Sequence, residues 1–315
     1  MERSAGGSWE GTAAFVSVFS ARGAGPEHET HIRAKPAINV ARTSTLYGIG
    51  REVSYATDVQ TALITGASSG IGLELAKRFA QDGISVILVA RESERLRKAA
   101  AAIETIAGTA PQVIPADLAD PQAPGQIFSA LAGQPIDFLV NNAGFGLGGP
   151  VSQTDRKVEL EMIQVNVTAL YELTKLFLPG MIARHSGRIM NVASTAAFQP
   201  GPLMAVYFAS KAFVLSFTEA IAEELDGSGV TVTALCPGAT ASDFQRRARI
   251  EKNKLVEGKA LGMMSAAEAA RIGYRGMMKG KVIVIPGFLN RLGVQSLRLG
   301  PRAVVRKAAK KLQES

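Results

Sequence analysis

Short, almost continuously apolar runs alternate along the chain with longer stretches in which apolar residues recur every three or four positions. The first pattern predicts buried strands, and the second predicts amphipathic helices. The expected strands span 61–65, 84–90, 112–118, 136–144, 187–194, 230–238 and 281–287. The expected helices span 71–83, 92–106, 121–132, 155–184 and 202–225.

Strands rich in Val, Ile and Leu that alternate with helices are typical of a parallel sheet covered on both faces. We therefore predict an α/β fold. A single doubly wound, Rossmann-type domain over 59–287 should hold a mostly parallel sheet of about seven strands with helices on both faces. Residues 1–58 show no sustained period, and we expect a mostly disordered extension; a targeting role, or a start codon assigned too far upstream, are the alternatives. Residues 288–315 are expected to form a basic, amphipathic C-terminal extension.

The composition is that of a folded globular protein, with 47% apolar and 20% charged residues among 315. The net charge of +8 is uneven, because residues 59–245 sum to −5 and residues 246–315 to +13. A nucleic-acid-binding protein is expected to carry its positive charge on the folded body, so we predict no nucleic-acid partner.

The cysteine and histidine content argues against a disulfide-stabilised protein and against a metal-binding protein. The single cysteine, Cys236, cannot form an internal disulfide, which suits a reducing, cytoplasmic location. The three histidines show no metal-ligand spacing, so no metal site is predicted. No apolar run reaches the length of about 18–20 residues that crosses a bilayer.

The sequence TGASSGIG (65–72) follows the first expected strand and opens the first expected helix. Gly66, Gly70 and Gly72 let the backbone turn tightly and approach a phosphate closely. The helix N-terminus offers that phosphate free N–H groups and the positive end of a dipole. A plain tight turn is the alternative. The strand–turn–helix context favours a site for a dinucleotide pyrophosphate.

The second expected strand ends at Ala90, and Arg91 follows it. An acidic residue at this point would accept hydrogen bonds from the ribose hydroxyls, whereas an arginine would hold a 2′-phosphate. Neither position is acidic, so the sequence favours NADP(H) over NAD(H). The alternative is that Arg91 is a solvated residue at the start of the next helix.

Tyr207 and Lys211 in YFASK (207–211) are four residues apart, so on a helix they share one face. A nearby ammonium group favours the phenolate and lowers the pKa of a phenol toward the range needed for proton transfer. Taken alone, the same five residues also fit an ordinary surface helix that carries an aromatic residue and a charge.

Taken together and in order, the motifs resemble those of the classical short-chain dehydrogenases/reductases, and the resemblance covers roughly residues 60–287. It is closest to a bacterial branch of broad-specificity or uncharacterised reductases. Ser194 precedes Tyr207 by 13 residues, which is the usual gap in this family. Ser242 stands where the family often has Thr, and it keeps the hydroxyl. The resemblance is carried by TGASSGIG (65–72), Asp117, NNAG (141–144), Asn166, Ser194, YFASK (207–211) and CPG (236–238).

The resemblance implies a role for each catalytic residue. Tyr207 would be the general acid/base, and Lys211 would lower its pKa and bind the nicotinamide ribose. Ser194 would donate a hydrogen bond to the substrate oxygen. Asn166 would maintain a local helix distortion and a water that leads protons to bulk solvent. A hydroxyl and a phenol proton at a carbonyl oxygen stabilise the negative charge that grows there during hydride transfer.

The resemblance also implies which residues bind the cofactor and the substrate. The expected cofactor-binding residues are Gly66, Ser68, Ser69, Gly70, Ile71, Gly72, Arg91, Asp117, Leu118, Asn142, Ala143, Gly144, Tyr207, Lys211, Pro237, Gly238, Thr240 and Ser242. The expected substrate-binding residues are Phe145, Ser194, Phe198 and Tyr207. Because the segments around these positions are mostly apolar, we expect a lipophilic carbonyl compound or secondary alcohol as the substrate.

The basic C-terminal region suggests further partners. RRARIEKNK (246–254) lies where the family has a mobile lid, and its cations could meet an acyl carrier or the phosphates of CoA; a solvated face is the alternative. A helix over 301–313 could lie on an anionic membrane surface, making the protein peripheral to the membrane, or pack on a partner subunit or on its own body. The resemblance implies a homo-oligomer, a dimer or tetramer. The expected apolar face of that helix comprises Val304, Val305, Ala308, Ala309 and Leu312.

Three functions are therefore compatible with the sequence. The first, which we favour, is an NADP-dependent oxidoreductase acting on a carbonyl or a secondary alcohol. The second is a non-catalytic NADP-binding regulator, which would not need to keep all four catalytic residues. The third is a membrane- or nucleic-acid-associated protein that acts through the basic tail.

Overall fold

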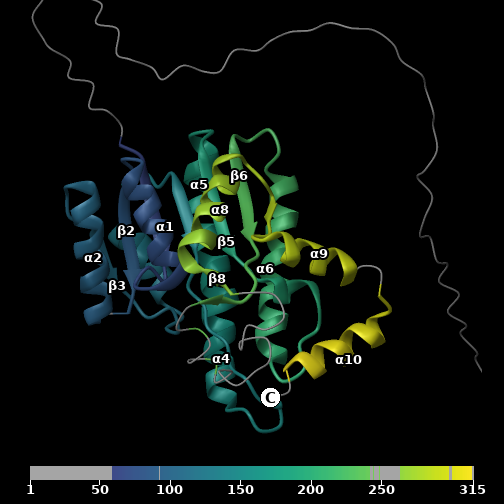
Figure 1. Cartoon of the computed structure of the whole chain (residues 1–315). Coiled ribbons are helices and arrows are strands. Elements are labelled where there is room, and N and C mark those ends of the chain that lie inside the picture. Colours follow the sequence, from purple (N-terminus) through teal and green to yellow (C-terminus); the bar gives the residue numbers. More distant parts are fainter. Residues whose placement is uncertain are drawn as a thin grey trace, which may run out of the picture. The chain divides into compact units, whose positions relative to one another are not determined.

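Seven strands form one parallel sheet in the order β3-β2-β1-β4-β5-β6-β9 (Figure 1). The computed structural model describes residues 59–91, 93–241, 244, 248, 263–297 and 300–313. The strands are β1 (Thr61–Thr65), β2 (Ser85–Ala90), β3 (Gln112–Pro115), β4 (Phe138–Asn141), β5 (Gly187–Val192), β6 (Val230–Leu235) and β9 (Ile283–Val284). The strand order reverses between β1 and β4, which opens a crevice at the carboxyl ends of the strands. The predicted doubly wound α/β fold is confirmed.

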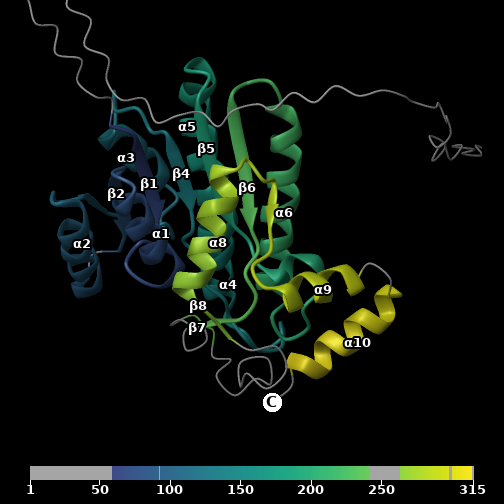
Figure 2. The same ribbon diagram turned by 45° about the horizontal axis from the view of Figure 1, so that its top comes forward.

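Helices cover both faces of this sheet (Figures 1 and 2). Leu75, Leu96 and Tyr274 belong to one buried cluster, which packs on one face of the strands. Ile127 and Leu173 belong to a second buried cluster, which packs on the other face. The first face is covered by α1 (Gly70–Gln81), α2 (Glu94–Ala107) and α8 (Ala266–Met278), and the second by α3 (Ala123–Ala130), α5 (Ala169–Ala183) and α6 (Ala205–Glu224).

An aromatic cluster fixes α1 and α8 to the sheet. The ring of Phe79 on α1 lies 5.1 Å from that of Phe138 on β4 and 5.0 Å from that of Tyr274 on α8. Phe79 is fully buried, which stabilises the fold by about 1.5–3 kcal/mol relative to an exposed side chain. The hydroxyl of Tyr274 donates a hydrogen bond to Asp82 just after α1, at 2.6 Å. The helix that carries the glycine turn is therefore held rigidly.

Several elements differ from the pattern in the sequence, and the helix α8 was not among the expected ones. The expected helix over 155–184 is α4 (Arg156–Ile163), a π-helical segment η1 (Gln164–Thr168) and α5. The last strand is shorter than 281–287, because Pro286 and Gly287 turn the chain into a helix rather than extending the strand. A small parallel pair, β7 (Thr240–Ala241) with β8 (Met264–Ser265), lies outside the main sheet and was not expected.

The C-terminal region forms α9 (Phe288–Leu297) and α10 (Arg302–Gln313), both in the same compact unit as the sheet. The apolar positions of α10 do not all face solvent: Ala309 is buried and Val305 half-buried, whereas Val304 is exposed. This favours the interpretation that α10 packs on its own domain through the face that carries Val305 and Ala309. The expectations for residues 1–58, the lid over 246–254 (apart from Ala248) and Ser242 lie outside the described residues.

One described helix, α6, is long and apolar enough to cross a bilayer when judged by length and composition, although the sequence predicted no such run. It carries the buried Lys211, and its Val214 and Ile221 belong to two of the buried clusters. The core helix of a folded domain has the same length and composition.

Candidate active site

A cleft of about 1390 Å³ lies at the carboxyl ends of the strands. It is bounded at one end by the glycine turn after β1 and at the other by the start of α6. The predicted site residues that line it are Gly66, Ser68, Ser69, Gly70, Ile71, Arg91, Asp117, Leu118, Asn142, Ala143, Gly144, Phe145, Ser194, Tyr207, Lys211, Pro237, Gly238 and Thr240. Gly72, Asn166 and Phe198 were also predicted but lie behind this surface.

The glycine turn needs residues without a side chain for two different reasons. Gly66 and Gly70 have positive φ angles of 65° and 58°, which favour glycine. Gly72 has an ordinary helical conformation, but a Cβ there would lie 2.5 Å from the carbonyl oxygen of Gly66 and closer still to Asn142 Nδ2. Gly72 therefore brings α1 close to the turn, and it does not line the cleft itself.

Thr65 and Asn142 tie the glycine turn to the end of β4. Asn142 Nδ2 donates to the carbonyl oxygen of Thr65 at 2.8 Å and to that of Gly66 at 3.2 Å. The Thr65 hydroxyl accepts from the backbone N–H groups of Asn142 and Ala143, each at 3.0 Å. From the sequence we expected Asn142 to bind the cofactor and did not single out Thr65. Both residues set the shape of the turn.

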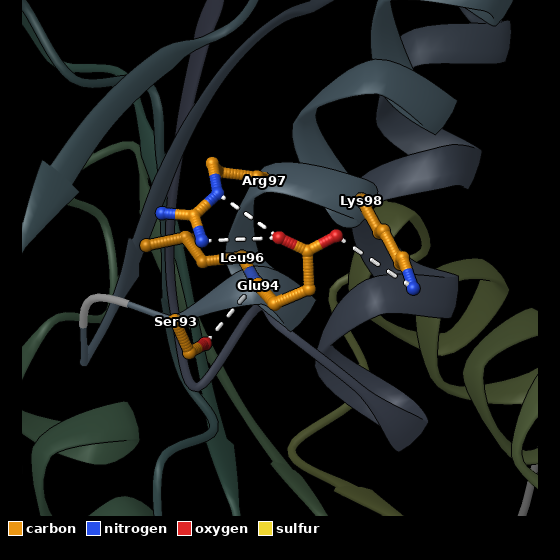
Figure 3. Close-up of polar contacts among 5 residues, drawn as sticks. All are labelled: Ser93, Glu94, Leu96, Arg97 and Lys98. Carbon is orange, nitrogen blue, oxygen red and sulfur yellow. Dashed lines mark hydrogen bonds and ion pairs between the residues drawn. The ribbon is translucent and has the colours of Figure 1, made fainter.

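The end of β2 carries a group of cations that face the cleft. Arg91, Ser93 and Arg95 line it, and Arg91 is exposed. Ser93 caps α2, because its Oγ accepts from the N–H of Leu96 at 3.2 Å (Figure 3). The N-terminus of α2 therefore adds the positive end of a helix dipole to this corner.

Glu94, in the first turn of α2, forms ion pairs with cations that do not line the cleft. The Glu94 carboxylate lies between Arg97, at 3.0 Å, and Lys98, at 3.7 Å, both further along α2 (Figure 3). Among the described residues at this corner, the positive charge of Arg91 and Arg95 thus faces the cleft while Glu94 is paired along its own helix. This arrangement suits an anionic group rather than a pair of ribose hydroxyls.

Ser194, Tyr207 and Lys211 meet at the other end of the cleft. Tyr207 and Lys211 are buried on one face of α6, as their spacing predicted, and the ammonium nitrogen lies 5.9 Å from the centre of the phenol ring. The Ser194 side chain, just after β5, hydrogen-bonds the side chain of Tyr207. Lys211 Nζ donates to the carbonyl oxygen of Val192 at 2.8 Å, which fixes the amine against the end of β5.

Burial determines the protonation of these groups. It raises the pKa of Tyr207 from 10.0 to about 12, against the opposing effect of the hydrogen bond with Ser194. This direction is opposite to the one that we expected from Lys211, because desolvation of the phenolate outweighs the attraction of an amine that is itself desolvated. Burial lowers the pKa of Lys211 from 10.5 to about 8.

Asn166 acts from behind the cleft. It is fully buried in the π-helical segment η1, so the helix distortion expected around it is present. Its Oδ1 accepts from the N–H of Phe145 at 3.0 Å, and its Nδ2 donates to the Phe145 carbonyl oxygen at 2.9 Å and to Ser210 Oγ at 3.1 Å. Asn166 therefore joins the loop after β4 to α6, beside Tyr207.

Apolar side chains surround Tyr207 on the substrate side. The ring of Phe244 lies 5.1 Å from the Tyr207 ring, and Phe145, Met204 and Phe208 line the same part of the cleft. From the sequence we expected Phe145 there and did not single out Met204, Phe208 or Phe244. Phe244 is far from Tyr207 along the chain, whereas Met204 and Phe208 are its neighbours in sequence and were overlooked.

Phe198, which we expected at the substrate, is not on the cleft surface. It packs against a buried cluster that includes Leu170, Ala193 and Val214. Within the short helix η2 (Thr195–Phe198), Ala196 lines the cleft and Phe198 faces the core. Among the described residues, no three His, Cys, Asp or Glu side chains gather as metal ligands.

Comparison with known proteins places these features in a family. A family model described as short chain dehydrogenase matches residues 60–253. The ketoacyl reductase HetN of Nostoc sp. is 36% identical over 185 residues, which are 57% of this chain and 63% of that protein. The very-long-chain 3-oxoacyl-CoA reductase of Homo sapiens is 30% identical over 207 residues, 64% of this chain and 66% of that protein.

A solved structure gives the same result. A short-chain dehydrogenase from Sphingobium yanoikuyae in complex with NADPH is 33% identical, with a TM-score of 0.69, and covers 79% of this chain and 97% of that chain. The structural similarity therefore covers most of this chain, although the chain spans less than two thirds of the length of the two named reductases.

Proposed function

Because the chain belongs to the short-chain dehydrogenase family, we propose that it reduces the carbonyl group of a lipophilic ketone with NADPH, and that Tyr207 donates the proton. The observation that carries this proposal is the cleft itself. One end of it presents the glycine turn at the N-terminus of α1, and the other presents Ser194, Tyr207 and Lys211 among apolar side chains. A group with both a pyrophosphate and a reactive ring fits such a cleft.

The residues fit a nicotinamide dinucleotide, which supplies the hydride when bound. The turn between Gly66 and Gly70 would hold its pyrophosphate. A Cβ on Gly144 would lie 3.0 Å from Asn166 Oδ1 and 3.3 Å from Lys211 Nζ, so a larger residue there would crowd the space beside the lysine.

The proton chemistry follows from the protein groups. Tyr207, with its pKa near 12, keeps its proton at neutral pH and can give it to a carbonyl oxygen that becomes negative. Ser194 donates a second hydrogen bond to that oxygen, and the charged Lys211 stabilises the phenolate that is left. Apolar neighbours such as the buried Phe208 and the half-buried Phe244 exclude water, which strengthens these interactions.

Arg91 and the N-terminus of α2 favour NADPH over NADH. Binding is measured by the fluorescence of each reduced cofactor, for the wild type, for Arg91→Ala and for the control Arg97→Ala, whose guanidinium is bound to Glu94 at 3.0 Å. We expect Arg91→Ala to weaken NADPH binding about tenfold and to leave NADH binding unchanged. Equal losses for both cofactors in the two variants would contradict this assignment.

Turnover separates an enzyme from an NADP-binding regulator. NADPH oxidation is followed with a series of lipophilic ketones and 3-oxoacyl thioesters, the latter because relatives carry the names ketoacyl reductase and 3-oxoacyl-CoA reductase. We expect activity that Tyr207→Phe reduces at least a thousandfold while NADPH still binds. Tight NADPH binding without turnover of any of these compounds would favour the regulator.

We also propose that α9 contacts an anionic membrane surface. Phe288, Leu289 and Leu292 lie on one side of this helix and are 76%, 51% and 57% exposed. The neighbouring α10 carries five basic residues and no acidic residue between Arg302 and Gln313, which suits anionic lipids.

Flotation with phosphatidylglycerol vesicles tests this contact. Phe288→Ser combined with Leu292→Ser should abolish flotation, whereas Val151→Ser, at another apolar residue that is 58% exposed, should not. Flotation that is equal for all three proteins would end the proposal, as would failure of the wild type to float.

A further inference from the structure

The side chain of Asn290 in α9 lies against the loop that follows β6. This loop carries Pro237 and Gly238, which line the cleft, whereas Asn290 does not line it. A Cβ added to Gly238 would lie 2.6 Å from both Nδ2 and Oδ1 of Asn290 and 2.8 Å from its Cγ. Gly238 has no positive φ angle, so the close approach of Asn290, rather than the backbone conformation, favours glycine here. Figures 1 and 2 show α9 near the end of β6.

The Asn290 amide is itself fixed. Its Nδ2 donates a hydrogen bond to the carbonyl oxygen of Pro286, four residues earlier, at 2.7 Å. Val294, one turn later on the same face of α9, is 3% exposed, so this face packs on the domain. The amide is therefore a fixed support behind the backbone of Gly238.

The loop after β6 is held from the other side by the residues that follow β5. The backbone N–H of Thr195 donates to the carbonyl oxygen of Pro237 at 2.9 Å, and the Ser194 hydroxyl donates to the same oxygen at 3.4 Å. Helix α9 also packs against the short helix η2, which begins at Thr195. The loop that carries Gly238 is therefore held between Asn290 and the chain next to Ser194.

We propose that Asn290 is a positioning residue, which holds Gly238 at the distance from Ser194 and Lys211 that the nicotinamide end of the cofactor requires. This inference rests on the proposed function, in which the cleft binds a nicotinamide dinucleotide and Ser194, Tyr207 and Lys211 act beside its reactive ring. Asn290 acts from outside the cleft, through the backbone of Gly238. The C-terminal helix α9 then contributes to cofactor binding.

A double-mutant cycle tests this contact directly. Gly238→Ala places a methyl group against the amide, and Asn290→Ala removes the three atoms nearest to that methyl group. The cycle consists of the wild type, both single variants and the double variant. The control is Arg291→Ala. Arg291 Nε also donates from α9 to a carbonyl oxygen, that of Ile285 at 3.0 Å, but this side chain is exposed and is not among the atoms nearest to Gly238.

Binding of NADPH and of NADH is measured by fluorescence, and the cofactor that binds more tightly is used for the cycle. We expect Gly238→Ala to bind it at least tenfold more weakly, Asn290→Ala about threefold more weakly, and the double variant like Asn290→Ala. Arg291→Ala should bind it like the wild type. Losses that multiply in the double variant overturn the role of Asn290, as do equal binding by all five proteins and equal losses in Arg291→Ala and Asn290→Ala.

Stability and turnover separate this role from a purely structural one and from the proposed reaction. If Asn290→Ala lowers the stability to urea while cofactor binding stays unchanged, the role is structural and the inference is wrong. We expect the KM for the cofactor to rise in parallel with the losses in binding, and the KM for the ketone to stay constant. If the wild type binds the cofactor but reduces no ketone, the proposed reaction is wrong, and rescue of Gly238→Ala by Asn290→Ala in the binding assay still supports the role of Asn290. No cofactor binding to the wild type overturns both.

Discussion

Replacing Gly72 by alanine tests how the glycine turn is built. Gly72 lies within α1 with helical backbone angles, so an alanine there has no conformational strain of its own. The added Cβ would, however, lie 2.5 Å from the carbonyl oxygen of Gly66 and even closer to Asn142 Nδ2. Real Cβ atoms do not approach other atoms so closely, so the turn or Asn142 must move.

The size of the effect follows from three contributions. Forcing an extra methyl group into a packed site costs about 1–3 kcal/mol. Moving Asn142 weakens its hydrogen bonds to Thr65 and Gly66, each worth about 0.5–1.5 kcal/mol. Alanine in place of glycine within a helix returns about 1 kcal/mol. The net expectation is a loss of about 2 kcal/mol in the free energy of unfolding, or about 4–8 °C in Tm.

The assay combines urea unfolding with NADPH titration of the wild type, Gly72→Ala and Gly125→Ala. Gly125 lies in α3, and a Cβ added there would meet no atom within 4 Å, so alanine should stabilise the protein by up to about 1 kcal/mol. We expect NADPH to bind Gly72→Ala at least tenfold more weakly, because the displaced turn is the pyrophosphate site. If Gly72→Ala is as stable as Gly125→Ala and binds NADPH like the wild type, the reasoning is wrong.

Two further predictions follow from the same structure. The pKa of Lys211 is lowered to about 8, so its charge is present below that pH and absent above it. We expect kcat/KM for reduction to be constant from pH 6 to 7 and to fall about tenfold per unit above pH 8, whereas a profile flat to pH 10 would show that this charge is not needed. Phe213 on α6 and Tyr171 on α5 are 41% and 42% exposed, and both contact the ring of Phe217, so we expect them to lie in a contact with a second copy of the chain. Phe213→Glu should lower the mass measured by light scattering, and a monomeric wild type would contradict the prediction.

Part of this site could be predicted from the sequence, because its residues lie at a fixed spacing within a single element. The glycine turn and the pair Tyr207 and Lys211 each lie within a single element, where helix geometry alone fixes their relation. Arg91 was placed by its position after a strand. The parallel sheet itself followed from the alternation of apolar runs with helical periods.

The rest of the site depends on contacts between distant segments. Phe244 and Gln313 reach the cleft from positions that no period connects to Tyr207. The apolar pattern of 155–184 continues through the π-helical segment, so it could not show where the helix is distorted around Asn166. The prediction for Phe198 was wrong because residues of one short helix face different ways. Ala196 lines the cleft, whereas the side chain of Phe198 packs against the core.

The direction of the Tyr207 pKa shift shows most clearly why charge alone was an insufficient guide. Reasoning from the spacing to Lys211 predicts a lowered pKa, but the phenol is 9% exposed and the amine is equally dehydrated. With a pKa near 12, on the order of 10⁻⁵ of the phenol is ionised at pH 7. A group in this state gives up a proton when an oxygen beside it becomes negative, and it removes one from an alcohol only when a further positive charge stabilises its phenolate. The same burial keeps Tyr207 protonated at neutral pH, and because a higher pKa also makes a phenol a weaker acid, a positive charge such as that of Lys211 must stabilise the phenolate when the proton leaves.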